Sequence, residues 1–303
     1  MKKTLLPILA LAMVCCTPQR QDTLQVTLTT DDADGRSISL VPMGNDEGAV
    51  EMAAEDGSYC ASVATSATGF YNLVSVKGYT QTIIPYYVPV TKSESGSYLS
   101  FGEGGALSLE GSKDNRALAA YTSTYAESSR ALWMLPKGDV EGARTLIEGF
   151  IAKGDSIIGA YRCSKPVAEY LKIWAYTIAY ESYAALPRIL GMPAEEFPYS
   201  REDMLAEPHT VLDSPIAALF PGTPGIVYAA IPNKNNLDSA LIHIEQHYTD
   251  TTLIKKVNNY IAGRYVSRYD YSQGFDKGLE RLQKATERYG LSPQHAINFA
   301  KHR

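Results

Sequence analysis

The sequence contains few of the residues that mark a redox, metal or hydrolytic enzyme. Among its 303 residues are four cysteines, five histidines and two tryptophans. No Cys-x-x-Cys pair occurs, which removes the usual dithiol centre of thiol–disulfide exchange. A Gly-x-Ser-x-Gly elbow and a Gly-Lys-Ser/Thr phosphate loop are also missing, and neither a Cys–His pairing nor a pair of carboxylates stands out as a catalytic site. The sequence therefore indicates no catalytic chemistry, and we expect no cofactor.

Excess basic charge and long apolar runs are also lacking. The 28 Lys and Arg residues are outnumbered by 33 Asp and Glu residues, and loss of Lys2 and Lys3 with a leader would take the formal charge from −5 to −7. An acidic balance argues against a nucleic-acid partner, which requires a basic surface. After Val14 no stretch has the length and apolarity of a transmembrane helix.

The first seventeen residues, MKKTLLPILALAMVCCT, have the order of a secretory signal. A positive start leads into a short apolar run from Leu5 to Val14, and Cys15 and Cys16 close it. This order resembles a bacterial lipoprotein signal, in which the cysteine after the cut is acylated. Cys16 is the favoured acylation site because the small Cys15 precedes it, whereas the branched Val14 precedes Cys15, which is the second choice.

This signal predicts where the protein sits. Residues 1–16 form the predicted signal peptide and 17–22 a polar tether. The mature protein is then held at a membrane by acyl chains, facing the periplasm or the cell surface, and durable anchorage requires more than one chain. An ordinary signal peptide cut nearby is the alternative. Mass spectrometry of the mature N-terminus distinguishes the two.

Residues 23–110 have the pattern of short β-strands. Leu24, Val26 and Leu28 alternate with polar residues, as in a half-buried strand. Further candidate strands are SISLVPM, GAVEMAA, SYCASVA, GFYNLVSVKG, YTQTIIPYYVPV and SYLSFG. Turn residues such as Asp56-Gly57 and Gly78 separate them. The spacing predicts a small antiparallel β-sandwich.

Residues 111–303 have the pattern of helices, so the fold class predicted for the chain is α+β. Ser112 suits the N-cap of a first helix, and the stripe containing Val167, Tyr170, Leu171 and Trp174 suits the packed face of another. Pro187 is expected to end or kink that helix. Residues 191–236 are rich in Pro and Gly and predict short helices with loops. LDSALIHIEQHY, DTTLIKKVNNYIAGRYVSRY and FDKGLERLQKATERYG predict three more helices, followed by a short one that starts at Ser292 and Pro293.

Two cysteines remain outside the signal, Cys60 and Cys163. An oxidising envelope permits a disulfide between them, but they fall in different predicted domains. The favoured interpretation is that each is a small buried apolar side chain.

His243 and His247, in the segment HIEQH, have the sharpest metal-like spacing. Two histidines at i and i+4 share one face of a helix and can chelate a metal ion. A zinc protease needs a glutamate directly after the first histidine or directly before the second, and Ile244 and Gln246 hold those positions. No third ligand is apparent in the sequence, so ordinary helix histidines are the favoured interpretation and these two are weak metal candidates.

Eight of the 21 tyrosines form two clusters in the sequence. Aromatic rings with a polar tip can bind sugar rings or a peptide. The spacing of Tyr176, Tyr180 and Tyr183 at i, i+4 and i+7 instead favours packing of one helix on another. The clusters are Tyr170, Tyr176, Tyr180 and Tyr183, and Tyr260, Tyr265, Tyr269 and Tyr271.

The segments GFYNLVSVKG and SYLSFGEGGALSLEGSKDNRALAAY resemble the N-terminal half of thioredoxin-like envelope lipoproteins. In that family a small β domain ends in a strand, a turn and a Gly-Ser-x-x-Asn step into helices, matched here by Gly111, Ser112 and Asn115. FDKGLERLQKATERYG resembles the closing helix of the helical region that follows. The family then carries a thioredoxin domain with a Trp-Cys-x-x-Cys centre. This sequence ends at Arg303, about where we expect that domain to begin, so no catalytic residue is carried over.

These observations favour a lipid-anchored envelope protein that acts as a non-catalytic binding or accessory module. An envelope redox protein or a peptide is the expected partner, and a thioredoxin domain supplied by another chain is one version of that idea. Two alternatives remain open. One is a thiol–disulfide oxidoreductase that is truncated or split, and the other is a surface lipoprotein that binds glycans through its tyrosine clusters.

Overall fold

The computed structural model describes most of the chain that follows the predicted tether. The predicted signal peptide and tether, with Cys15 and Cys16, lie outside the described residues. In the part of the chain that is described, no helix has the length and apolarity needed to span a bilayer. The described residues are 23–31, 35–44, 48–55, 58–64, 69–89, 94–101 and 107–303.

The first part of the protein consists of two β-sheets. One sheet has the strand order β4-β5-β1-β8-β9, and the other has the order β3-β2-β6-β7. Within the described residues the strands are β1 (Thr23–Thr30), β2 (Arg36–Pro42), β3 (Val50–Glu51), β4 (Ala53–Glu55), β5 (Ser58–Ala64), β6 (Phe70–Lys77), β7 (Thr80–Tyr87), β8 (Glu94–Phe101) and β9 (Leu107–Glu110).

The two sheets enclose one apolar core. Val26 and Leu28 of β1 are buried against Ile38 and Leu40 of β2, which belongs to the other sheet. Every second residue of these strands faces inward because the side chains of a strand alternate between its two faces. The predicted β-sandwich, and with it the α+β fold class, is confirmed.

Two features of the sandwich depart from the sequence pattern. β1 and β8 pair in parallel, whereas every other strand pair in the described residues is antiparallel. The segment GAVEMAA does not form one strand but divides at Met52 into β3 and β4, which lie in different sheets. Met52 is buried, and its N–H donates to the Ile38 carbonyl at 2.9 Å. Alternation along a strand predicts which of its faces is buried, but it does not predict which strand pairs with it. The parallel pairing and the division at Met52 could therefore not be predicted from the sequence.

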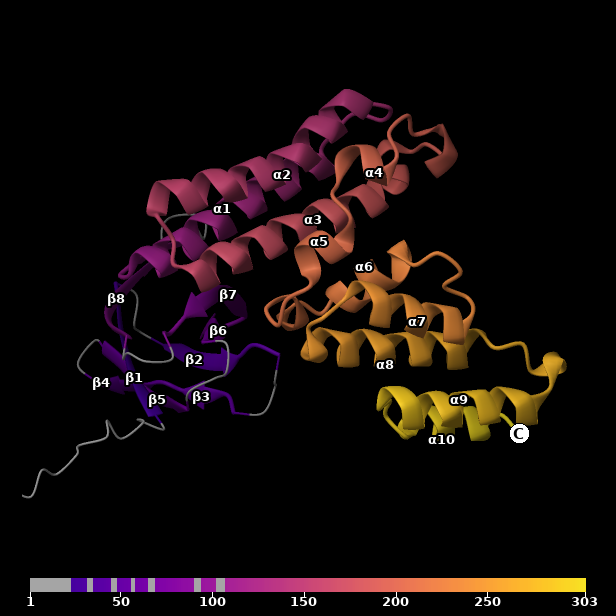
Figure 1. The fold of residues 1–303 in the computed structure, drawn as a ribbon. Helices are drawn as coiled ribbons and strands as arrows, with labels where there is room; N and C mark the ends of the chain where they lie inside the picture. The colour runs from indigo at the N-terminus through magenta and orange to yellow at the C-terminus, as the bar shows by residue number, and fades with distance from the viewer. Residues whose placement is uncertain are drawn as a thin grey trace, which may run out of the picture.

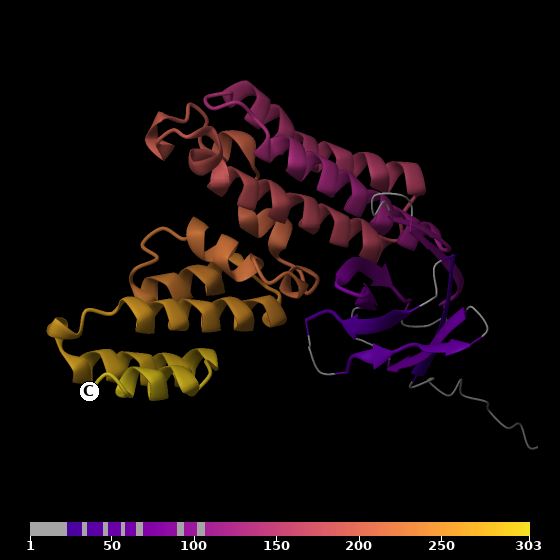
Figure 2. The ribbon, with the colours of Figure 1, turned by 180° about the vertical axis from the view of Figure 1, so that it is seen from behind.

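The second part of the protein is helical. Figures 1 and 2 show α1, α2 and α3 as a layer of long helices that reaches the sandwich at one end, whereas α9 and α10 lie away from the sandwich. The helices are α1 (Lys113–Trp133), α2 (Val140–Tyr161), α3 (Lys165–Leu190), α4 (Arg201–Met204), α5 (Pro208–Leu212), α6 (Thr223–Ala230), α7 (Leu237–His247), α8 (Thr251–Arg268), α9 (Phe275–Tyr289) and α10 (Gln294–Ala300), with short 3-10 turns η2 (Ala194–Glu196), η3 (Ala217–Leu219) and η4 (Tyr271–Gln273).

Helix α3 continues past the proline that was expected to end or kink it. It runs through Pro187 to Leu190 and ends at Gly191, which has a left-handed φ of 65°. A proline inside a helix removes one backbone hydrogen bond. The burial of Leu186 and Leu190 on either side of Pro187 offsets that loss.

The junction between the sandwich and α1 gives a physical reason for the Gly-Ser-x-x-Asn sequence. Ser112 is the N-cap, and its side chain accepts from the Asn115 N–H at 3.3 Å. The Asn115 side chain accepts from the Tyr87 N–H at 2.7 Å and donates to the Tyr87 carbonyl at 3.0 Å. Gly111 has a φ of 142°, and a Cβ there would lie 2.8 Å from the Ser97 hydroxyl. Asn115 thus pairs with the outer edge of β7 as a neighbouring strand would.

Side chains of each part contribute to the core of the other. Phe70 of β6 stacks on Tyr170 of α3 with ring centroids 4.5 Å apart, and it packs with Tyr87 in the core of the helices. Ala119 of α1 is buried in the core of the sandwich. The boundary between the two parts is therefore a packed apolar contact rather than a solvated linker.

Candidate functional site

A cleft of about 930 Å³ lies between the sandwich and the helices, and we call it the interdomain cleft. The sandwich supplies residues from the end of β2, from β6 and from β7, and the helical part supplies α3, η3 and α8. Its apolar wall includes Met43, Ile83, Tyr170, Trp174, Phe220 and Tyr260, and its polar groups include Asn72, Thr252, Lys255, Lys256 and Asn259.

The aromatic side chains of the interdomain cleft form a connected set. Tyr170 lies 4.9 Å from Phe220 and 5.9 Å from Trp174, measured between ring centroids. Burial raises the pKa of the Tyr170 hydroxyl above its ordinary value. Ile83 and Tyr260 are 51% and 38% exposed, which leaves two large apolar side chains open to solvent in the wall of the cleft. Exposed rings beside a concave apolar wall are typical of a ligand site.

Some polar side chains of the cleft are bonded to the protein itself, whereas the side chain of Lys255 is not. Lys256 Nζ donates to the Ala218 carbonyl at 2.8 Å, and the Asn259 side chain accepts from the Ser292 N–H at 2.7 Å, so both hold the protein together. The side-chain ammonium of Lys255 makes no hydrogen bond or ion pair with the described residues, although its backbone carbonyl accepts from the Asn259 side chain at 2.8 Å. The described lining holds no histidine, cysteine, aspartate or glutamate. These side chains can bind and orient a ligand through apolar contacts and hydrogen bonds.

Most of the clustered tyrosines support the fold. The hydroxyls of Tyr176, Tyr183 and Tyr269 donate to backbone carbonyls at 2.7, 3.1 and 2.8 Å. One tyrosine of each cluster, Tyr170 and Tyr260, lines the interdomain cleft. The sequence identified the two clusters, but it could not show that one member of each lies in the same cavity.

The two metal candidates lie together with a third histidine that the sequence did not point to. The rings of His243 and His247 are stacked with centroids 4.1 Å apart, and His247 Nδ1 donates to the His243 carbonyl at 2.9 Å. His209 of α5 lies 5.6 Å from His247. Across the described residues, no group of three or more His, Cys, Asp or Glu side chains has the arrangement of a metal site.

This histidine cluster makes the stability of the protein depend on pH. Burial, and then the neighbouring His247 and His209, lower the pKa of His243, while Glu207 opposes them. The folded protein therefore binds this proton more weakly than the unfolded chain, whose histidine titrates near about 6.5. The part of the stability that His243 contributes is fully present above that pH, and it is lost as the pH falls through the lower pKa of the folded protein.

The measurement is the urea midpoint at a series of pH values. Between about pH 7 and pH 5 we expect His243→Asn to make the decline shallower than in the parent protein. His302→Asn, at an exposed position near the C-terminus, serves as the control and should leave the slope unchanged. Equal slopes in all three proteins would contradict the assignment.

The two cysteines of the described chain are free, and neither forms the disulfide considered above. Cys60 lies on β5 and Cys163 follows α2, and both are half-buried rather than fully buried. Burial, and then the nearby Asp114, raise the pKa of the Cys163 thiol. A raised pKa reduces the thiolate that thiol–disulfide exchange needs.

Comparison with known proteins adds no relative. No protein-family model, curated protein or solved structure matches this chain. The resemblance to thioredoxin-like envelope lipoproteins therefore depends on the motifs quoted above.

Proposed function

We propose that this chain is a lipid-anchored protein of the cell envelope and a non-catalytic binding or accessory module, with the interdomain cleft as its ligand site. The observation that carries the proposal is the cleft itself, which takes aromatic rings from α3 and α8 and apolar side chains from the sandwich, and whose described lining contains no histidine, carboxylate or thiol. The lipoprotein-like order of residues 1–17 supports the envelope location. The motif at Gly111, Ser112 and Asn115 supports a relation to the N-terminal half of thioredoxin-like lipoproteins.

An oligosaccharide is the ligand class that the cleft favours. Tyrosine and tryptophan rings offer apolar faces to the C–H faces of sugar rings, and Asn72, Thr252 and Lys255 offer hydrogen bonds to hydroxyl groups. The alternative of a thiol–disulfide oxidoreductase has less support, because the Cys163 thiol is half-buried with a raised pKa and Cys60 lies in the sandwich.

Tryptophan fluorescence tests the proposal directly. The chain has two tryptophans, Trp133 and Trp174, so Trp133→Phe leaves a single reporter inside the cleft. Titration of this variant with a panel of oligosaccharides should give a saturable change in emission, with Kd about 10 μM to 1 mM for the matching sugar. Tyr260→Ala should weaken binding about tenfold because one stacking ring is lost.

Tyr79→Ala is the matched control for this titration. Tyr79 is fully exposed at the turn between β6 and β7 and does not line the cleft, so its loss should leave the Kd unchanged. A flat titration across the whole panel would remove the glycan. Saturable binding of a proline-rich peptide in the same assay would retain the binding site but replace the ligand class.

A further inference from the structure

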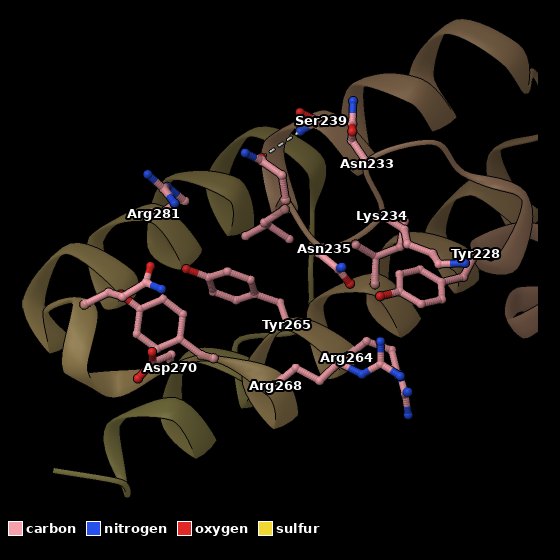
Figure 3. A pocket seen from close by; sticks show the side chains of 15 residues that line it. Tyr228, Asn233, Lys234, Asn235, Ser239, Arg264, Tyr265, Arg268, Asp270 and Arg281 are labelled. Atoms are coloured by element: carbon pink, nitrogen blue, oxygen red, sulfur yellow. Dashed lines mark hydrogen bonds between the residues drawn. The ribbon is translucent and has the colours of Figure 1, made fainter.

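A second cavity, of about 820 Å³, lies in the helical part and has a different chemistry. It is formed by the segment between α6 and α7, by α8, by η4 and by α9, and Figure 3 shows the side chains that line it. Four of the lining residues are cationic: Lys234, Arg264, Arg268 and Arg281. Asp270 is the one acidic residue in the described lining, and its carboxylate already accepts from the Ser272 N–H at 3.0 Å. We call this cavity the arginine pocket.

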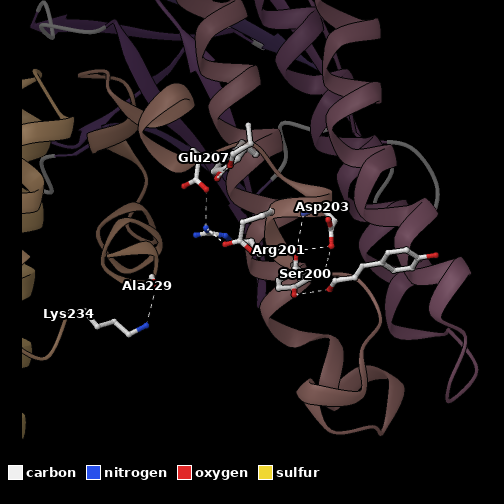
Figure 4. A network of polar contacts seen from close by, with 11 residues as sticks. Ser200, Arg201, Asp203, Glu207, Ala229 and Lys234 are labelled. Atoms are coloured by element: carbon white, nitrogen blue, oxygen red, sulfur yellow. Dashed lines mark hydrogen bonds and ion pairs between the residues drawn. The ribbon is translucent and has the colours of Figure 1, made fainter. Parts of the chain in front are cut away.

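Among the described residues, two of these arginines have no anionic partner. Arg264 Nε is buried and makes no hydrogen bond, and within the described chain no carboxylate lies at ion-pair distance from Arg264 or Arg268. Arg201 on α4 has a different environment, because Glu202 and Glu207 both pair with it, as Figure 4 shows for Glu207. Buried polar groups in proteins are nearly always paired, so an unpaired guanidinium nitrogen in a cavity wall points to a missing partner.

The other two cationic side chains of the arginine pocket, Arg281 and Lys234, are bonded to neighbouring residues of the protein. Arg281 pairs with Asp238 at 3.5 Å, and Lys234 Nζ donates to the Ala229 carbonyl at 3.1 Å, the contact drawn in Figure 4. In Figure 3 the Tyr265 side chain lies in the middle of the residues that line the pocket. Its hydroxyl is buried beside Arg281 but makes no hydrogen bond of good geometry. The wall of the pocket thus holds a hydroxyl and a guanidinium nitrogen that have no hydrogen-bond partner among the described residues.

We propose that the arginine pocket binds a small polyanion, a molecule with two or more phosphate or carboxylate groups, through Arg264, Arg268 and Arg281. The planar fork of a guanidinium group matches the paired oxygens of both anions, and such charge-assisted hydrogen bonds are the strong ones in proteins. The amides of Asn233 and Asn235 in the same wall provide hydrogen bonds for the uncharged part of the ligand. This site is separate from the interdomain cleft and does not depend on the function proposed for it.

Isothermal titration of the full chain at constant ionic strength tests the proposal, with pyrophosphate and citrate as probes. At least one probe should bind saturably with Kd below about 1 mM. Saturation by pyrophosphate alone identifies a phosphate ligand, and saturation by citrate alone identifies a carboxylate ligand. Arg264→Gln/Arg268→Gln should weaken the binding at least tenfold. Arg130→Gln/Arg144→Gln removes the same charge from α1 and α2, outside the pocket, and should leave the binding within about twofold.

The same experiments can overturn the proposal. Absence of saturable binding of either probe up to about 10 mM would do so, and so would an equal loss of binding in both double variants, which would indicate general charge attraction. If the glutamine variant fails to fold, Arg264→Lys/Arg268→Lys retains the charge but removes the fork. That variant should bind severalfold more weakly, and unchanged binding would refute the assignment.

Discussion

Asn115→Ala should lower the free energy of unfolding by about 2–6 kcal/mol, a large share of the stability of an ordinary domain. The Asn115 side chain is fully buried, and it satisfies both the N–H and the carbonyl of Tyr87. Alanine leaves two buried backbone groups without partners, and each costs about 1–3 kcal/mol. Because β7 is an edge strand in the described part of the sheet, no strand described there can replace the lost hydrogen bonds.

Urea unfolding followed by circular dichroism measures this loss. Asn115→Asp should be at least as destabilising as alanine, because it removes the donor to the Tyr87 carbonyl and places a second buried carboxyl group beside Asp114. Asn298→Ala, at an exposed position of α10, is the matched control and should change the midpoint little. An Asn115→Ala protein within about 0.5 kcal/mol of the parent would contradict the role assigned to this side chain.

Phe70→Ala should cost about 3–5 kcal/mol and should also separate the unfolding of the two parts. The Phe70 ring is fully buried between Tyr87 and Tyr170, so its loss leaves a cavity at the contact between the sandwich and the helices. In the parent protein we expect this contact to couple the two parts into one unfolding transition. Without the ring, we expect the sandwich and the helices to unfold at different urea concentrations.

Two spectroscopic signals distinguish these outcomes. Both tryptophans lie on helices, so fluorescence reports on the helical part, whereas far-ultraviolet circular dichroism also includes the sandwich. Phe150→Ala removes the same ring from the interior of the helical core and is the control. It should lower stability by a similar amount while the two signals remain coincident. Coincident transitions in Phe70→Ala as well would show that this ring does not couple the parts.

Local structure was largely predictable from the sequence because it depends on periodicity and on capping residues. Val26 and Leu28 alternate with polar residues and are buried, as the pattern indicated. On α3, Val167 and Leu171 are buried as their helical spacing indicated, and Gly290 closes α9 in a left-handed conformation. These features follow from side-chain direction and backbone conformation within one segment.

The sites were not predictable because they depend on which segments meet. Ile83 and Tyr260 line one cleft although they lie in different parts of the chain, and no local pattern connects them. His209 joins His243 and His247 only because the fold brings its ring within 5.6 Å of the His247 ring, measured between centroids. A signal for the arginine pocket did exist, since Arg264 and Arg268 are four residues apart on one helix face. The structure was needed to interpret this spacing, because it shows that no carboxylate of the described chain forms an ion pair with Arg264 or Arg268.

The parallel pairing of β1 with β8 also governs the order in which the protein folds. Thr29 and Thr30 of the first strand pair with Tyr98 and Leu99, so the middle of the larger sheet lacks one neighbour until most of residues 23–110 have been synthesised. Closing so long a loop is slow compared with forming a hairpin or a helix. Asn115 follows soon after β8 in the chain. We therefore expect completion of the larger sheet and attachment of the first helix to form one late step, before which one edge of β1 lacks its β8 partner.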